Sequence, residues 1–156
     1  MTTEATTPVS ESEQRVRNNF SRQAFMTTLG AEMVTVGRGT VEIQLPFSSK
    51  LTQQHGYVHA GAITAVLDSG CGYAALSLAP EGSNVLTVEF KVNLLSPAVG
   101  EFFIAKAQVK RAGKTLTVCT ADAIAVSNGS EKVVATMLAT IFVVPGVEAR
   151  SKVCAL

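Results

Sequence analysis

The hydrophobic pattern of the chain changes its period several times, and each change predicts a different element. Ser10 and Glu13 fit a helix-capping box, and apolar residues recur at helical spacing from Val16 to Leu29. Gly30 is a typical helix terminator. We therefore expect one short amphipathic helix that ends at Gly30.

Strand-like alternation follows from Ala31. A turn at residues 37–39 separates two predicted strands, and another alternating strand covers residues 85–95. The apolar side chains of that strand share one face, which we expect to join the core; they are Leu86, Val88, Phe90, Val92 and Leu94.

A long uncharged segment, Ala60 to Leu78, lies between these strands and is interrupted only by Asp68. Its length and its Ala and Leu content predict a helix that is buried on most of its surface. It approaches the length of a membrane span, but a central aspartate would be costly in lipid, and Gly70 and Gly72 weaken the helix. We therefore expect the helix inside the protein core.

Three more strands are predicted at residues 102–110, 115–126 and 132–144, with a hairpin at Asn128-Gly129. One long helix flanked by strands is an α+β arrangement. The 156 residues suit a single domain, which we place at 12–145, between a flexible N-terminal tail at 1–11 and a C-terminal tail at 146–156.

The composition and charge of the chain indicate which kinds of partner it binds. The formal net charge is +1, which predicts no nucleic acid and no anionic membrane as partner, and the 47% hydrophobic content allows for a surface partly covered by other subunits. The three cysteines (Cys71, Cys119 and Cys154) show no metal-ligand spacing, so no metal is expected. Their odd number and the lack of a signal peptide predict a cytoplasmic protein.

Asp68 is the only residue between His59 and Pro80 that is ionised at neutral pH. It is either a buried structural acid with polar partners or a reacting group. Free backbone N–H groups at Ala60 and Gly61, at the positive end of the helix dipole, could stabilise an oxyanion. These groups lie roughly 12 Å from Asp68 along the helix, so one acyl carbon would need them from different subunits.

Several motifs together resemble the hotdog-fold thioesterases, and most closely the phenylacetate-pathway-like (PaaI-like) acyl-CoA thioesterases. The resemblance covers residues 25 to 144, and the segments that carry it are Leu29-Gly30, QQHGYVHAG at 53–61, Asp68, TVEFKVNLLSP at 87–97 and the AGK at 112–114. It implies a hotdog fold, in which an antiparallel sheet of five to six strands wraps around one long helix.

The resemblance also implies an enzyme that hydrolyses a fatty or aromatic acyl-CoA, with coenzyme A as part of the substrate and no separate cofactor. Asp68 would act as nucleophile or general base, and the Ala60 or Gly61 N–H would polarise the thioester carbonyl. Gln53 would position the carbonyl or the water, and Thr87 would orient the attacking group. A dimer, or a tetramer formed from two dimers, would carry each site at a subunit interface.

Other residues keep two interpretations. The family has His-Gly-Gly where this chain has His59-Ala60-Gly61, and His59 is either catalytic or a structural hydrogen-bonding residue. The basic residues Lys110, Arg111 and Lys114 would hold CoA phosphates or cover a solvated strand edge.

Three further features remain as hypotheses. Cys71 suits core packing better than catalysis, Phe20, Phe25 and Tyr73 could shape the acyl pocket, and Asp122 has no evident role. Two other functions stay open: an acyl-CoA or acyl-carrier binding module without turnover, and a hotdog hydratase or dehydratase with a catalytic histidine.

Overall fold

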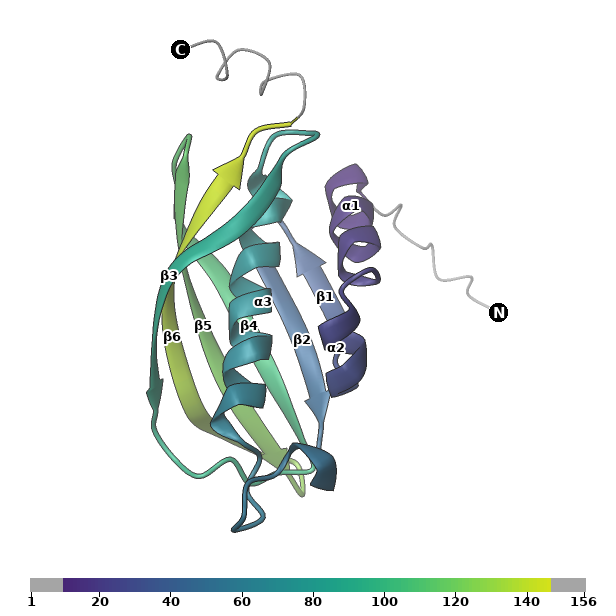
Figure 1. The fold of residues 1–156 in the computed structure, drawn as a ribbon, viewed down its shortest axis with the longest axis vertical. Coiled ribbons are helices and arrows are strands. Elements are labelled where there is room, and N and C mark those ends of the chain that lie inside the picture. Colours follow the sequence, from purple (N-terminus) through teal and green to yellow (C-terminus); the bar gives the residue numbers. More distant parts are fainter. Residues whose placement is uncertain (1–9, 147–156) are drawn as a thin grey trace, which may run out of the picture.

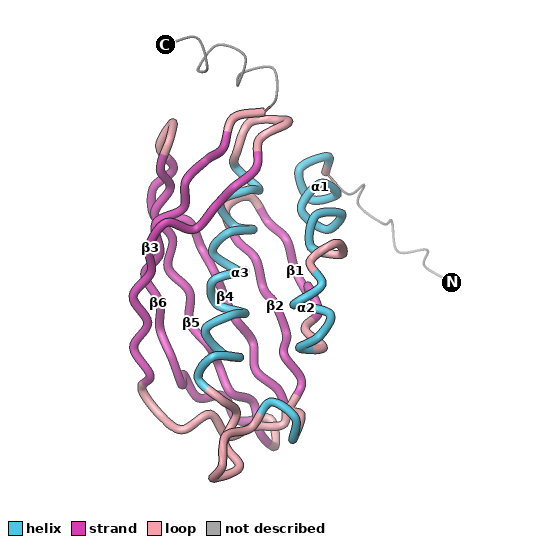
Figure 2. The backbone as a smooth tube through the Cα atoms, viewed as in Figure 1, coloured by secondary structure: helices cyan, strands magenta, loops and turns pink. Residues whose placement is uncertain are grey.

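A computed structural model, which describes residues 10–146, shows a six-stranded antiparallel sheet curved around one long helix (Figures 1 and 2). The strand order is β1-β2-β4-β5-β6-β3. This confirms the expected α+β hotdog fold. The elements are α1 (Glu11–Phe20), α2 (Ala24–Leu29), β1 (Glu32–Gly37), β2 (Thr40–Pro46), the 3-10 turn η1 (Ser49–Leu51), α3 (Ala60–Leu78), β3 (Asn84–Leu94), β4 (Phe102–Ala112), β5 (Leu116–Ser127) and β6 (Ser130–Val144).

The central helix α3 has the bounds that its sequence predicts, Ala60 to Leu78. The concave face of the sheet is rich in buried alanines, which let the helix lie close to it: Ala105, Ala107, Ala121, Ala123, Ala135 and Ala139. At Gly70 the helix lies close to β4, because a Cβ built there would lie 3.1 Å from Cβ of Ala107. Among the described residues, no helix is long and apolar enough to cross a membrane.

The prediction of a single N-terminal helix is wrong, because the chain forms two helices there. Ser10 caps α1 by accepting a hydrogen bond from the Glu13 N–H at 3.2 Å, as the capping box predicts. The chain then leaves the helix after Phe20 and enters α2, which ends at Gly30 with a φ of 70°. No Gly or Pro marks this break in the sequence, so packing of α1 against α3 and β1 decides it.

The predicted single core face of β3 is also wrong. A bulge between Thr87 and Glu89 reverses the alternation, so Leu86 points away from α3 whereas Thr87 points toward it. Phe90 lies on the helix side of the sheet but stays 44% exposed. The cause is the position of β3 at the end of the sheet, where it has a neighbouring strand on one side only.

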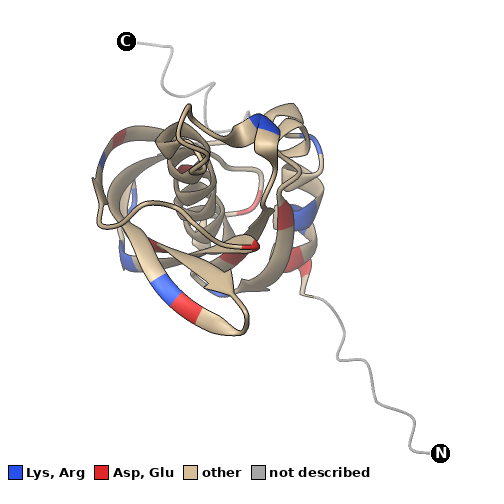
Figure 3. Ribbon diagram, turned by 90° about the horizontal axis from the view of Figure 1, so that it is seen from below, with Lys and Arg blue, Asp and Glu red and all other residues tan. Residues whose placement is uncertain are grey.

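The remaining strands match their predicted order, and β4, β5 and β6 form the expected meander. Asn128 and Gly129 both have positive φ, as a two-residue hairpin turn requires. Asp122, which had no evident role, is exposed on β5. In the strand register it lies opposite Lys106 of β4, and Lys106 lies opposite Glu42 of β2. Figure 3 shows blue and red segments around the outside without a continuous face of either colour.

Candidate active site

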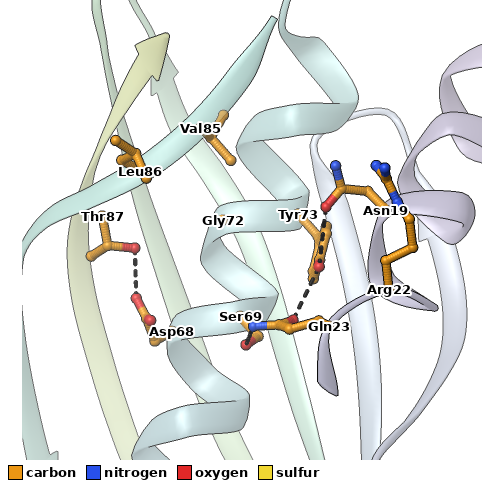
Figure 4. Close-up of a pocket in the computed structure, with 10 residues that line it drawn as sticks. All are labelled: Asn19, Arg22, Gln23, Asp68, Ser69, Gly72, Tyr73, Val85, Leu86 and Thr87. Carbon is orange, nitrogen blue, oxygen red and sulfur yellow. Dashed lines mark hydrogen bonds between the residues drawn. The ribbon is translucent and has the colours of Figure 1, made fainter. Parts of the chain in front are cut away.

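Asp68 lies in the middle of α3 and is half-buried. Its Oδ1 accepts a 2.7 Å hydrogen bond from the Thr87 hydroxyl of β3 (Figure 4). The bulge of β3 places Thr87 on this side of the sheet. An O–H donor at this distance from a carboxylate makes a strong, charge-assisted hydrogen bond, so Asp68 is held in one orientation with its second oxygen free for other partners.

A cavity of about 500 Å³ opens beside this pair. Its floor is α3, one wall is the start of β3, and the opposite wall is the junction of α1 and α2 (Figure 4). Asp68 and Gly72 are one helical turn apart and face β3, whereas Ser69 and Tyr73 face the α1–α2 wall. The volume is in the range of small-molecule sites.

The start of α3 presents backbone N–H groups and a capping histidine. His59 is the N-cap residue, and its Nδ1 accepts a 2.8 Å hydrogen bond from the Gly61 N–H. A Cβ at residue 61 would lie 3.0 Å from that nitrogen, so glycine leaves room for the cap. The Ala60 N–H forms no hydrogen bond within the described part of the chain. Asn128 is the one described non-glycine residue with positive φ, so alanine at position 60 is not strained.

A second cavity, of about 410 Å³, contains Ala60 and Gln53. The other end of β3 borders it, through Leu94. Gln53 is itself engaged locally, because its Oε1 accepts a hydrogen bond from the His55 N–H. The six predicted site residues therefore do not share one cavity. Asp68 and Thr87 meet in the first cavity, Gln53 and Ala60 line the second, and His59 and Gly61 line neither.

The predicted phosphate-binding residues lie elsewhere. Lys110 and Arg111 are at the end of β4, Lys114 follows in the turn, and all three are exposed. None of them lines the Asp68 cavity or the Ala60 cavity.

Of the three aromatic residues expected to shape the acyl pocket, only Tyr73 lines the Asp68 cavity. Phe20 packs behind Tyr73, with ring centroids 5.6 Å apart, whereas Phe25 is 55% exposed. Sequence reasoning missed Asn19 and Gln23, which line the cavity from the α1–α2 junction. Only the break between the two helices brings them there, and no sequence motif marks it.

The buried thiols belong to the core. Burial raises the pKa of Cys119 to about 12, and burial above all raises the pKa of Cys71, with smaller contributions from Cys119 and Asp68. The Cys119 Sγ lies 3.5 Å from the Cys71 carbonyl oxygen. Such thiols stay protonated at neutral pH, so Cys71 is not an activated nucleophile.

Comparison with known proteins shows the family of this chain. A family model described as the thioesterase superfamily matches residues 55–141. A predicted esterase from Halobacterium salinarum is 32% identical, over 76% of this chain and 89% of that protein.

Among solved structures, a thioesterase family protein from Silicibacter pomeroyi is 52% identical and has a TM-score of 0.85. The match covers 86% of this chain and 99% of that one. The Escherichia coli PaaI protein from the phenylacetic acid degradation operon is 20% identical and has a TM-score of 0.79, over 89% and 98% of the two chains. At that identity the likeness concerns the fold.

Proposed function

Since the chain belongs to the thioesterase superfamily, we propose that it hydrolyses the thioester bond of a fatty or aromatic acyl-CoA to the free acid and CoA. The observation that carries this proposal is the Asp68–Thr87 pair. It holds one carboxylate in a fixed orientation at the edge of a cavity large enough for an acyl group.

In the proposed reaction, the free oxygen of Asp68 accepts a proton from a water molecule, whose oxygen forms a bond to the thioester carbonyl carbon. The carbonyl oxygen becomes an oxyanion, which a backbone N–H at a helix start stabilises. The C–S bond then breaks, and the CoA sulfur leaves and takes up the proton. In a nucleophilic route, the same Asp68 oxygen would bond to the carbonyl carbon as the C–S bond breaks and the CoA thiolate leaves, and water would then hydrolyse the resulting anhydride and free the Asp68 carboxylate.

The helix start that stabilises the oxyanion is best supplied by a second copy of the chain. Asp68 and the free Ala60 N–H are eight residues apart on one helix, roughly 12 Å along its axis, and they line different cavities. The two groups of one chain therefore cannot both contact the same acyl carbon.

The edge strand β3 provides a way to join two copies. It is at the end of the sheet, its backbone edge is free, and it exposes apolar side chains such as Val88 and Phe90. The Asp68 cavity borders the start of β3 and the Ala60 cavity borders its end. If two β3 strands pair antiparallel about a twofold axis, the Asp68 cavity of one copy faces the Ala60 cavity of the other.

This arrangement gives the dimer that we propose as the active unit, alone or as half of a tetramer. Gln53 would then act with the Ala60 N–H on the thioester carbonyl, whereas His59 holds the helix start through its bond to Gly61. We also assign the CoA phosphates to the exposed Lys110, Arg111 and Lys114. The two described cysteines are free thiols, which suits a cytoplasmic location.

The test is free-thiol release from benzoyl-, phenylacetyl-, hexanoyl- and palmitoyl-CoA by the wild type, Asp68→Asn and Asp122→Asn. Asp122→Asn is the matched control, because Asp122 is exposed on the outer face of the sheet. We expect wild type and control to release thiol from at least one substrate, and Asp68→Asn to be slower by about a hundredfold or more.

If Asp68→Asn kept the wild-type rate, Asp68 would be a structural acid. If the wild type bound acyl-CoA without any thiol release, the protein would be a binding module and the hydrolase proposal would be wrong.

A further inference from the structure

The cavity beside Asp68 has a polar wall opposite Thr87 (Figure 4). The Tyr73 hydroxyl donates a 3.0 Å hydrogen bond to Oε1 of Gln23, and Nε2 of Gln23 donates one of 3.3 Å to the Ser69 hydroxyl. Tyr73 is only 7% exposed. The second N–H of the Gln23 amide has no acceptor among the described residues, so an unbranched hydrocarbon chain in this space would cover it without offering it a partner, which is unfavourable.

Rigid elements fix this wall. Ser69 and Tyr73 are one turn apart on α3, and the Phe20 ring packs edge-on against Tyr73. Gln23 is the N-cap residue of α2, so the break between the two N-terminal helices determines its position. The hydrogen-bonding groups are therefore held in place before any ligand binds, as selective recognition requires.

Two neighbouring residues add unused hydrogen-bond donors. Asn19 and Arg22 line both this cavity and a groove of about 810 Å³ beyond it. The ion pair between Arg17 and Glu13 is the only one among residues 10–146, so Arg22 has no carboxylate partner there. Arg22 and Tyr73 line the same cavity (Figure 4). Burial raises the pKa of Tyr73, and the positive charge of Arg22 acts in the opposite direction.

We propose that Tyr73, Gln23 and Arg22 select acyl groups that carry an oxygen-bearing polar group at their far end, a hydroxyl or a carboxylate. Gln23 donates its second amide N–H to this oxygen, Tyr73 holds the Gln23 side chain in place through its own hydrogen bond, and Arg22 adds affinity when the group is an anion. Tyr73 lies five residues beyond Asp68, roughly 7.5 Å along the helix axis, so the polar group is at the end of a short chain. This inference rests on the proposed function.

A matched series of CoA thioesters of one chain length tests it: hexanoyl-, 6-hydroxyhexanoyl- and adipoyl-CoA. We expect the wild type to show a kcat/KM about tenfold or more higher for the two polar substrates than for hexanoyl-CoA. Tyr73→Phe and Gln23→Leu should each reduce that preference by about tenfold, measured against each variant's own hexanoyl-CoA value. Arg22→Gln should reduce the preference for adipoyl-CoA more than that for 6-hydroxyhexanoyl-CoA.

Lys132→Gln is the control for loss of one positive charge, because Lys132 is exposed at the start of β6, away from the cavity. The three substrates should keep their wild-type order in this variant. A purely structural network would give a different result: Tyr73→Phe would change all three kcat/KM values by the same factor. Equal values for the three substrates in the wild type would also overturn the inference.

Binding separates this inference from the proposed function. The same three ligands are titrated into Asp68→Asn by calorimetry, since recognition at the far wall does not need the reacting carboxylate. Preferential binding of the polar ligands without turnover by the wild type would support the polar wall and contradict the hydrolase. Turnover of all three ligands without preference in rate or binding would support the hydrolase and contradict the polar wall.

Discussion

The hydrogen bond between Thr87 and Asp68 is the contact that most directly links the fold to the proposed reaction. Thr87→Val removes the hydroxyl but keeps the size and the β-branch, so the edge strand should keep its shape. Asp68 then loses its one hydrogen-bond partner among the described side chains. Its carboxylate is free to rotate away from the orientation that the reaction needs.

The size of the effect follows from the 2.7 Å distance and the burial of the pair. A hydrogen bond to a charged group contributes about 1.5–3 kcal/mol, which corresponds to roughly 10- to 150-fold in rate if the whole of it acts on the transition state. Asp68 is only half-buried, so water replaces part of the lost bond. We therefore expect kcat to fall by about tenfold.

The assay is steady-state thiol release from the best substrate of the panel, by wild type, Thr87→Val and Thr87→Ser. Thr87→Ser keeps the hydroxyl and should recover most of the lost rate, whereas a role in strand packing alone would leave serine as impaired as valine. Urea unfolding of each variant checks that the fold is intact. A Thr87→Val enzyme within twofold of the wild type would refute the assigned role of the hydrogen bond.

Three further predictions concern the helix, the thiols and the edge strand. Gly72→Ala should raise the free energy of unfolding by about 0.5–1 kcal/mol, because alanine favours the helix and its Cβ meets no atom within 4 Å. Gly70→Ala should be less stable than Gly72→Ala, because its Cβ would lie 3.1 Å from Ala107. Urea denaturation measures both values, and the reverse order would contradict the packing. Because burial raises the pKa of Cys71 and Cys119, both thiols stay protonated at pH 8. In a Cys154→Ala background, a thiol reagent should then label them only as fast as the protein unfolds, and rapid labelling of the native protein would show that the thiols are accessible. Phe90→Glu should halve the mass measured by light scattering and abolish thiol release, because it places a charge in the proposed β3 interface. The control Leu116→Glu lies on a strand inside the sheet and should keep the wild-type mass and thiol release. An unchanged mass for Phe90→Glu would place the interface elsewhere.

The sequence alone determined the elements whose signals are local. Ser10 and Glu13 mark the first helix start, Asn128 and Gly129 mark a hairpin, and the uncharged run from Ala60 to Leu78 marks the central helix. Each depends on side chains a few residues apart, which act on the backbone next to them. The order of these elements was sufficient for the fold class.

The tertiary structure decided what depends on partners far along the chain. Alternation in β3 predicted one buried face, but a bulge and a place at the end of the sheet leave Leu86 and Phe90 exposed. The candidate site shows the same limit. Asp68 stands out from its sequence alone, whereas Gln23 comes to its cavity because packing breaks a helix where no Gly or Pro does. Contacts between segments tens of residues apart set both outcomes, and a periodic pattern within one segment does not record them.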